Sequence, residues 1–182
     1  MRQMVSHEFL PYLNPANGCL QSRQDMNDIY QLPQKFRIVS GGQTGADRAG
    51  LDWAVSLAVD HGGWCPKGRR SEDGRIPDHY SLGETPLSNY LQRTEWNVRD
   101  SDATVVFTLS EAVTGGSKRT MEFAKRLQRP SVHIRPGVHP RYLARFLAHN
   151  RVQTLNVAGS RESSAPGVSG FVKEVLSAAI RV

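Results

Sequence analysis

The segment from Ile38 to Asp47 reads Ile-Val-Ser-Gly-Gly-Gln-Thr-Gly-Ala-Asp, a short apolar strand followed by a glycine-rich turn and the start of a helix. Glycine has no Cβ, so such a turn lets the backbone approach a ligand closely. The free N–H groups at a helix N-terminus favour an anion, usually a phosphate. Thr44 and Asp47 have the spacing of an N-cap and a capping box. The turn predicts an anion or nucleotide site, formed by Gly41, Gly42, Gln43, Thr44, Gly45 and Asp47.

Two better-known phosphate motifs are excluded at this turn. The dinucleotide fingerprint G-x-G-x-x-G has a different glycine spacing, and the P-loop pattern G-x-x-x-x-G-K-[ST] is absent. The sequence therefore supports neither a kinase nor a simple dehydrogenase. The alternative at this position is a tight turn that only packs the helix on the strand.

A second glycine turn, Gly115-Gly116-Ser117, follows the strongly apolar strand expected over residues 103–109 and also begins a helix. In a parallel sheet, ligands bind beyond the carboxyl ends of the strands. We therefore expect the amides of Gly116 and Ser117 to face the same crevice as the first turn. Two such turns suit a ligand with a phosphate at one end and a polar group at the other. The alternative is an ordinary N-cap at Ser117.

Residues 66–87 form a long segment rich in charge, glycine and proline. Loops of this length in a compact domain are usually functional or mobile. Lys67 and Arg69 follow a short expected strand, and with Gly68 as a hinge they are expected to fold over a bound anion and neutralise its charge. The alternative is a solvated loop.

Residues 93–102 form a further polar cluster, in which Arg93 and Asn97 share one face if the segment is helical. That face would close over the site or contribute to a dimer contact. Local spacing shows no Ser-His-Asp or Cys-His set, and the two cysteines, Cys19 and Cys65, have no metal-type spacing. We expect no metal centre.

The length, charge and composition of the chain limit the class of protein. The chain has 182 residues and a net charge of +6, and residues 123–161 contain eight Lys and Arg but no Asp or Glu. Such a field attracts anions. A solvated surface, an anionic cofactor, a nucleic-acid backbone and an acidic subunit contact stay open as explanations. The sequence contains no apolar run of membrane-spanning length and no secretory hydrophobic region, and it is poor in cysteine. We therefore expect a cytoplasmic protein that does not span a membrane.

The apolar pattern separates a polar N-terminal extension, residues 1–34, from a domain over residues 35–182. Strands are expected over 36–40, 63–65, 103–109, 131–134 and 154–158, and helices over 44–60, 88–99, 115–128, 140–149 and 168–180. The glycine pair at 62–63 is expected to end the first helix. This alternation predicts an α/β fold, a three-layer sandwich with a mainly parallel central sheet and helices on both faces.

Four parts of the sequence together resemble the molybdenum-cofactor carrier proteins. They are Gly-Gly-Gln-Thr-Gly-Ala-Asp-Arg with Leu-Asp-Trp-Ala (41–54), Gly-Gly-Trp-Cys-Pro-Lys-Gly-Arg-Arg (62–70), Glu-Asp-Gly-Arg-Ile-Pro (72–77) and Tyr-Leu-Gln-Arg-Thr-Glu-Trp-Asn-Val-Arg-Asp-Ser-Asp-Ala-Thr (90–104). The resemblance covers most of residues 37–135. It implies a Rossmann-like domain of the superfamily that includes the lysine-decarboxylase-like cytokinin-activating proteins and DNA-processing protein A. It also implies a homo-dimer or homo-tetramer and a bound molybdenum cofactor (molybdopterin), with a nucleotide as the other candidate ligand.

The resemblance also implies roles for individual residues. The turn at 41–45 corresponds to the family's first phosphate-binding loop. Residues 115–117 with Thr120 and Glu122 are similar to the second motif, Pro-Gly-Gly-x-Gly-Thr-x-x-Glu, of the cytokinin-activating relatives, which cleave the glycosidic bond of nucleoside monophosphates. The sequence departs from that motif at the leading proline, where Thr114 stands, and at the last glycine. We therefore expect a non-catalytic binding protein. A nucleotide phosphoribohydrolase with Glu122 as its acid/base is the alternative, and a sensor of nucleotide signals is another.

Overall fold

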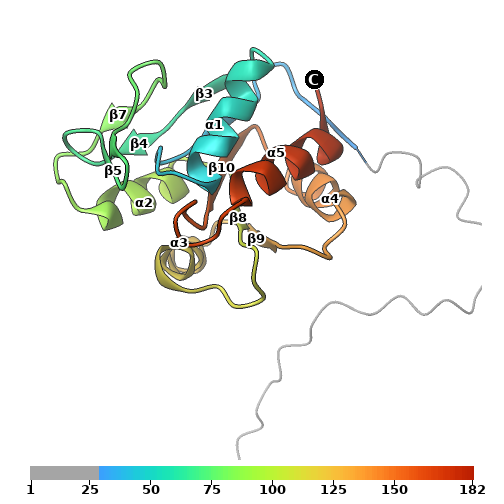
Figure 1. The fold of residues 1–182 in the computed structure, drawn as a ribbon. Helices are drawn as coiled ribbons and strands as arrows, with labels where there is room; N and C mark the ends of the chain where they lie inside the picture. Colours follow the sequence, from blue (N-terminus) through green and yellow to red (C-terminus); the bar gives the residue numbers. More distant parts are fainter. Residues whose placement is uncertain (1–28) are drawn as a thin grey trace, which may run out of the picture.

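The structure is a computed structural model, which describes residues 29–182 (Figure 1). Its strands are β1 (Tyr30–Gln31), β2 (Arg37–Val39), β3 (Asp60–Gly62), β4 (Trp64–Cys65), β5 (Arg70–Ser71), β6 (Gly74–Arg75), β7 (Gly83–Glu84), β8 (Ala103–Phe107), β9 (Ser131–Ile134), β10 (Thr154–Gly159) and β11 (Ile180–Arg181). Its helices are α1 (Ala46–Ser56), α2 (Tyr90–Arg99), α3 (Gly115–Arg126), α4 (Arg141–His149) and α5 (Val168–Ala179).

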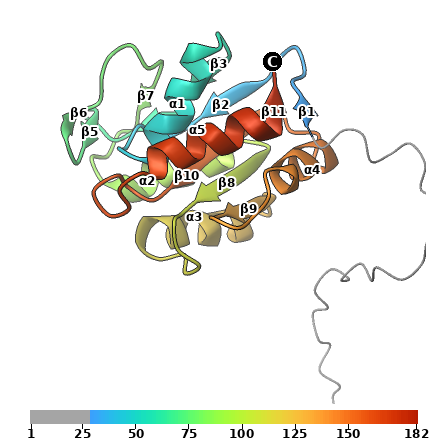
Figure 2. The ribbon, with the colours of Figure 1, turned by 45° about the vertical axis from the view of Figure 1, so that its right-hand side comes forward.

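The central sheet has five strands in the order β3-β2-β10-β8-β9, and each neighbouring pair is parallel. All five residues of β8 are buried, as expected of a strand that is covered on both faces. Helices α1, α4 and α5 pack together on one face of the sheet, and α2 packs with α3 on the other (Figures 1 and 2). The predicted three-layer α/β sandwich is confirmed.

The central strand of the sheet comes from near the C-terminus of the chain. If β10 and α5 preceded β2, the sheet would have the order 3-2-1-4-5 of an ordinary doubly wound fold. The two ends of the described chain lie side by side, because β1 pairs in parallel with β11, with Tyr30 opposite Ile180 (Figure 2). Such a permutation therefore needs no large change in the path of the chain. The domain is therefore a doubly wound sheet whose first βα unit has moved to the end of the chain.

Most of the elements lie within a few residues of their predicted positions, and two corrections concern the segment after α1. The helix ends at Ser56 rather than at residue 60, because Ala58 adopts a positive φ of 55°. The chain then forms β3, the edge strand of the main sheet, where only a helix stop was expected. The predicted strand over 63–65 exists as β4, but it pairs with β7 in a separate two-stranded sheet.

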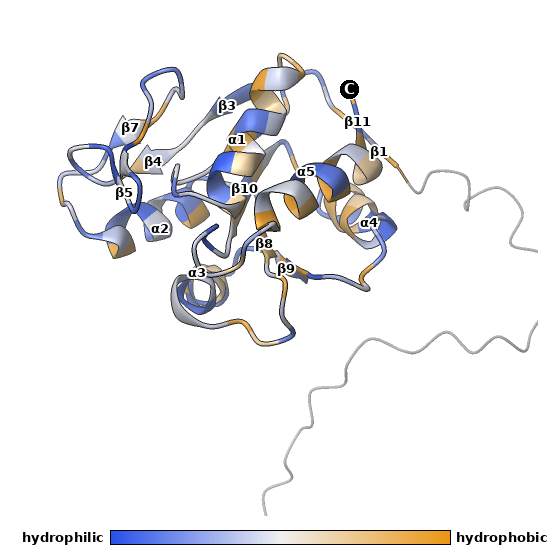
Figure 3. Ribbon diagram, in the orientation of Figure 1, coloured by the Kyte–Doolittle hydropathy of each residue, from blue (hydrophilic) through white to orange (hydrophobic). Residues whose placement is uncertain are grey.

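The main core lies between the sheet and the layer formed by α1, α4 and α5, and it includes large side chains from β8, β10 and α4 such as Phe107, Leu155 and Leu147. Helix α3 is largely hydrophilic (Figure 3). Its buried side chains are Ser117, Thr120 and Ala124. Two hydroxyls are thus buried near the start of α3, where core packing would favour apolar side chains.

The segment 66–87 packs around a small core of its own. Leu51, Cys65, Ile76, Tyr80 and Leu82 form a buried cluster beneath it. The loop itself contains the antiparallel hairpin β5–β6 and the strand β7. It is therefore a structured subdomain attached to the edge of the sheet.

The proposed division of the chain at residue 34 stays a prediction, since residues 1–28 lie outside the described part. Tyr30 already belongs to the domain contacts, because its hydroxyl donates to the Val152 carbonyl at 2.7 Å. Among residues 29–182, no helix is long and apolar enough to span a membrane.

Candidate functional site

A cavity of about 450 Å³ lies at the carboxyl ends of β2, β8 and β10, where we expected the site. Its wall comes from four places in the chain: Gln43 and Asp47 of the first glycine turn, Tyr90, Leu91, Arg93 and Thr94 of α2, Thr114 to Ser117 with Arg119 and Thr120 at the start of α3, and Ala158 and Gly159 at the end of β10 with Ser160, Arg161 and Ser164 after it. The volume is in the range of small-molecule sites. The two predicted turns therefore do meet at a common cavity.

The first glycine turn uses most of its donors internally. The amide of Gln43 donates to Asp47 Oδ2 at 3.4 Å, and the amide of Thr44 donates to the Gln43 side-chain oxygen Oε1 at 3.0 Å. The amide of Ala46 donates to the Ser160 carbonyl at 3.0 Å. The Asp47 carboxylate and the Gln43 side chain thus take up the amides of Gln43 and Thr44, which corrects the expectation that these two amides are open. For the other residues of the turn, the anion site stays a prediction.

The expected cap of α1 is also corrected. The N-cap is Gly45 and not Thr44, and no side chain caps this end. The Thr44 hydroxyl instead hydrogen-bonds to the carboxylate of Glu72, from the tip of the β5–β6 hairpin. Ser163, after β10, donates to the same carboxylate at 2.7 Å. These hydrogen bonds hold the pKa of Glu72 below its usual value and join the hairpin to the sheet edge.

The glycines of this turn permit close packing within the protein. A Cβ at Gly41 would lie 1.8 Å from Nη1 of Arg93, and one at Gly45 would lie 2.4 Å from the Ser160 carbonyl oxygen. Gly41 therefore lets Arg93 reach Asp47, and Gly45, with φ 78°, lets the segment after β10 lie against the start of α1.

Asp47 and Arg93 form a buried ion pair in the wall of the cavity. Nη1 of Arg93 lies 2.8 Å from Oδ2 of Asp47, and the two side chains are 12% and 5% exposed. Burial raises the pKa of the Asp47 carboxyl, and the charge and hydrogen bond of Arg93 oppose that rise. Arg93 thus favours the charged form of a carboxyl that burial alone would favour as the neutral acid.

The second glycine turn is open. Residues 29–182 offer no hydrogen-bond acceptor to the amides of Gly115, Gly116 and Ser117, which begin α3 after the N-cap Thr114. A Cβ at either glycine would meet nothing within 4 Å. Three free amides at the positive end of a helix dipole, beside a cavity, are a favourable place for an anion.

Two further arginines line the cavity from opposite sides. Arg119 lies on α3, and Arg161 follows β10. Both are exposed, and each has a carboxylate partner: Glu122 at 2.8 Å from Arg119, and Glu72 at 3.7 Å from Arg161. Glu122 and Glu72 are not among the residues that line the cavity, so each of these pairs presents its guanidinium to the cavity wall.

An aromatic ring lies among the cationic groups. The Cζ atoms of Arg93 and Arg161 lie 5.9 Å and 5.4 Å from the centroid of the Tyr90 ring. Both distances are within the range of cation–π contacts. The cavity therefore offers a flat surface near its charged wall.

Two residues that line the cavity each have a buried nitrogen atom without a partner in the described part of the chain. Nε2 of Gln43 and Nε of Arg93 are buried and have no hydrogen-bond acceptor among residues 29–182. The Gln43 side chain as a whole is only 4% exposed. Buried donors are nearly always hydrogen-bonded, so such atoms call for an explanation such as a ligand or an ordered water.

Lys67, Gly68 and Arg69 do not line this cavity. Arg69 is buried and donates to the carbonyls of Ile76, Pro77, Tyr80 and Leu82 at 2.7–3.1 Å. Its guanidinium therefore holds the loop together, which corrects the expected role of neutralising a ligand. Lys67 is exposed, and the amide of Gly68 donates to Glu84.

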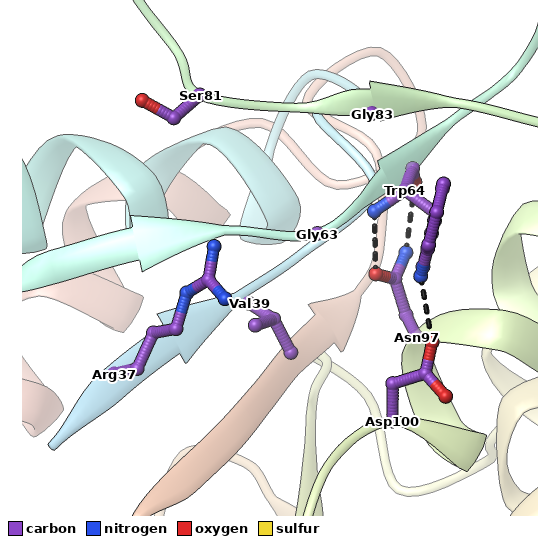
Figure 4. A pocket seen from close by; sticks show the side chains of 8 residues that line it. All are labelled: Arg37, Val39, Gly63, Trp64, Ser81, Gly83, Asn97 and Asp100. Carbon is purple, nitrogen blue, oxygen red and sulfur yellow. Dashed lines mark hydrogen bonds between the residues drawn. The ribbon is translucent and has the colours of Figure 1, made fainter. Parts of the chain in front are cut away.

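Asn97 lies at a different cavity, of about 290 Å³, between β2, β4 and the end of α2 (Figure 4). Its side-chain amide makes two hydrogen bonds with the backbone of Trp64, at 2.8 and 2.9 Å. The indole of Trp64 donates to Asp100 at 2.8 Å. Asn97 thus fixes β4 to α2, and it is not among the residues that line the larger cavity.

Glu122, the acid/base of the alternative enzymatic reading, also lies outside the larger cavity. It lines a smaller pocket, of about 310 Å³, with Leu91 and Phe123, and its carboxylate pairs with Arg119. Thr120 does line the larger cavity, and its hydroxyl donates to the Gly116 carbonyl at 3.1 Å. The structure offers no support for Glu122 as a group that touches a ligand there.

Sequence reasoning missed several residues of the cavity: Tyr90, Leu91, Thr94, Arg119, and the segment of Ser160, Arg161 and Ser164 after β10. Arg161 belongs to the basic stretch 123–161, for which an anionic cofactor was one of the open explanations, but it was not predicted as a site residue. This segment reaches the cavity because β10 lies at the centre of the sheet. No local pattern in the sequence predicts that position of β10.

Comparisons with known proteins agree with this fold. The profile of the circularly permutated YpsA SLOG family matches residues 38–180. A crystal structure of a protein named "putative molybdenum carrier protein", from Syntrophus aciditrophicus SB, is 39% identical and covers 80% of this chain and 95% of that one, with a TM-score of 0.76.

A structure of (E)-4-hydroxy-3-methyl-but-2-enyl diphosphate reductase is 10% identical and covers 79% of this chain and 59% of that one. Its TM-score is 0.36, too low to support an inference. No curated protein matches the chain.

Proposed function

Since the chain belongs to the circularly permutated YpsA SLOG family, we propose that it is a non-catalytic binding protein for a phosphorylated small molecule. The ligand is an anionic pterin of the molybdenum-cofactor type or a nucleotide-like compound. It binds in the cavity at the ends of β2, β8 and β10.

The open start of α3 is the observation that carries this proposal. The free amides of Gly115, Gly116 and Ser117 supply donors that need no rearrangement. Arg119 and Arg161 add guanidinium groups, which match phosphate oxygens in a bidentate geometry. The phosphate of the ligand binds at this end of the cavity.

The unpartnered Nε2 of Gln43 supports the proposal independently. The atom is a buried donor, and its residue lines the same cavity on the side of the first glycine turn. A ligand that reaches from α3 to Gln43 carries a polar group at the end away from its phosphate. Pterin and nucleotide phosphates both have this shape.

For a molybdenum cofactor, the cavity fits the phosphate and the ring rather than the metal. Within the part of the chain that the structure describes, no cluster of three or more His, Cys, Asp or Glu residues is placed to hold a metal ion. The Cys65 thiol lies in the small core beneath the 66–87 segment. The proposed contacts are therefore to the organic part of the cofactor.

Isothermal titration calorimetry with the full chain tests the proposal, with the molybdenum cofactor, guanosine and adenosine monophosphates and pyrophosphate as probes. At least one of them should bind. The double variant Arg119→Gln/Arg161→Gln should bind that probe at least about tenfold more weakly, because hydrogen bonds to charged groups contribute about 1.5–3 kcal/mol each.

The matched control is Arg141→Gln, which removes an exposed positive charge from the start of α4, outside the lining of the cavity. Its affinity should stay within about twofold of the unmodified protein, since a distant exposed charge is largely screened by salt. The proposal is wrong if no phosphorylated probe binds, or if both variants weaken binding equally.

Assembly and location complete the proposal. The resemblance implies a homo-dimer or homo-tetramer, and we place the protein in the cytoplasm. Multi-angle light scattering of the full chain measures the assembly directly, and a single-copy mass would contradict that part of the proposal.

A nucleic acid stays an alternative partner for the basic stretch 123–161. Steeply salt-dependent binding to DNA or RNA would favour it.

A further inference from the structure

The side chain of Gln43 has a fixed orientation. Its Oε1 accepts a hydrogen bond from the amide of Thr44 at 3.0 Å and another from the amide of Glu72 at 2.9 Å. Both partners are backbone donors, so the atom that faces them is the oxygen and the assignment of the amide follows from the network. Nε2 is therefore on the opposite side, buried and without an acceptor among residues 29–182.

The lining of the cavity also contains an acceptor. Asp47 lies four residues further on, and it lines the same cavity as Gln43. Its Oδ2 is held by Arg93 and by the Gln43 amide, so the carboxylate cannot turn away. A carboxylate has about four lone-pair sites on its two oxygens, which leaves capacity for a donor of the ligand.

A ring that reached both groups would lie near Tyr90. The Tyr90 side chain lines the cavity together with Arg93 and Arg161, whose guanidinium groups are within 6 Å of its ring centroid. Aromatic and guanidinium planes are the surfaces on which nucleobases stack. The cavity thus combines a stacking surface with one donor and one acceptor.

We propose that Gln43 and Asp47 select the ring of the ligand. Nε2 of Gln43 donates to a ring oxo group, and Asp47 accepts from the adjacent ring N–H and amino groups. The edge that presents an oxo acceptor beside these donors is the 2-amino-4-oxopyrimidine edge, which guanine and pterins share. The inference rests on the proposed function, since the phosphate of the same ligand binds at α3.

Adenine can form neither of these hydrogen bonds. It presents an amino donor where guanine has its oxo group, so Nε2 of Gln43 stays unpaired and faces another donor. It also has an unprotonated ring nitrogen where guanine offers N–H to Asp47. Leaving buried polar groups unpaired is a strong basis for discrimination between analogues.

Calorimetry of the unmodified full chain with guanosine, inosine and adenosine 5′-monophosphates tests the inference. The three share the phosphate and the ribose and differ only at the ring. Guanosine monophosphate should bind at least about tenfold more tightly than adenosine monophosphate. Inosine monophosphate, which lacks the 2-amino group, should lie between them.

The outcomes separate the two claims. If all three bind with equal affinity, the proposed function stands and the selection by Gln43 and Asp47 is overturned. A preference for adenosine monophosphate also overturns it. If none of the three binds, and pyrophosphate and the molybdenum cofactor do not bind either, the proposed function and this inference fail together. If the molybdenum cofactor binds but none of the three nucleotides does, the proposed recognition of the shared 2-amino-4-oxopyrimidine edge is overturned and the proposed function stands.

A variant gives a second test. Gln43→Glu keeps an oxygen for the amides of Thr44 and Glu72 and replaces the Nε2 donor by an acceptor. The preference for the guanine ring should then fall by about tenfold or more, and an unchanged preference overturns the role of Gln43. Gln128→Glu, the same change at an exposed position after α3, is the matched control. The ligand comparison in the unmodified chain remains decisive if Gln43→Glu does not fold.

Discussion

Arg93 reaches across from α2 to the first glycine turn and places its Nη1 atom 2.8 Å from Oδ2 of Asp47, with both side chains nearly buried. The absence of a Cβ at Gly41 is what leaves room for the guanidinium. The pair joins α2, on one face of the sheet, to α1, on the other, and it forms part of the cavity wall. It therefore supports both the fold and the site.

Removal of Arg93 should destabilise the protein strongly. The variant Arg93→Met leaves the Asp47 carboxylate buried without its cation, which typically costs 3–5 kcal/mol, so the free energy of unfolding should fall by about that amount. Equilibrium unfolding in urea, followed by circular dichroism, measures it. Arg75→Met breaks an exposed pair with Asp78 and should leave the free energy of unfolding nearly unchanged. Equal losses for the two variants would contradict the assigned role of the buried pair.

The role of Arg69 can be separated from ligand binding. Arg69→Met removes the donors to four loop carbonyls, so the free energy of unfolding should fall by about 3 kcal/mol or more. Amide hydrogen exchange of residues 66–87 should also become faster. The affinity of the folded protein for phosphorylated probes should change less than about threefold, because Arg69 does not line the cavity.

Arg70→Met is the control for this experiment, because Arg70 is the exposed neighbour of Arg69 in the same loop. It should leave both stability and exchange nearly unchanged. If Arg69→Met instead lost ligand affinity at unchanged stability, Arg69 would be a charge-neutralising group, as its sequence position first suggested.

The elements that the sequence predicted well are those whose signal is local. The apolar run at 103–109 and the strand at 131–134 stand out from their flanking turns, and β8 and β9 lie there. The place of β10 between β2 and β8 was not predictable in this way, because strand order depends on which buried faces fit together. For that reason Arg161 and its neighbours were missed as residues of the cavity.

The two glycine turns show a second limit of sequence reasoning. Both have the pattern of an anion site, yet the amides of Gln43 and Thr44 are taken up by side chains of the protein, whereas those of Gly115, Gly116 and Ser117 have no acceptor among residues 29–182. At the other turn, Asp47 folds back on the amide of Gln43. Whether an amide is free depends on the orientation of a side chain several residues away, and the spacing of glycines carries no information on that.

Gly116 provides a direct test of the open amides. A Cβ at this position meets no atom of the protein within 4 Å, so Gly116→Ala should keep or slightly raise the melting temperature, as expected of alanine in a helix. The added methyl group stands beside the anion position. Affinity for pyrophosphate should therefore fall severalfold in calorimetry.

Gly170→Ala is the matched control, since Gly170 is a helical glycine in α5 with equally open surroundings. Its affinity should equal that of the unmodified chain. Equal affinity in both variants would show that the phosphate does not approach the start of α3.

The topology predicts that the chain tolerates reconnection. A permuted chain that begins at Arg151, runs to Val182 and continues from Met1 to Asn150 places the β10–α5 unit first, and it cuts the loop between α4 and β10. The fold should form, because β1 already pairs with β11 and new termini in an exposed loop are usually tolerated. Circular dichroism and affinity for the same probes check this. A permuted chain without cooperative unfolding would contradict it.

The acid stability of the hairpin depends on Asp73. Hydrogen bonds from Arg48 and Ser71 lower the pKa of Asp73 to about 2 in the folded protein, below the value of about 3.9 in an unfolded chain. The interaction therefore stabilises the fold above about pH 4, and its contribution is lost as the pH falls toward 2. Asp73 is 47% exposed, so the contribution should not exceed about 1 kcal/mol.

Urea unfolding of Asp73→Asn between pH 6 and pH 3 measures this contribution. The difference in unfolding free energy from the unmodified protein should be largest at pH 6 and should shrink as the pH is lowered, because the unfolded chain of the unmodified protein takes up a proton at Asp73 first. Asp60→Asn, at an exposed position on the edge strand β3, serves as the control and should show a small difference throughout. A difference for Asp73→Asn that grew toward pH 3 would have the wrong sign and would contradict the assignment.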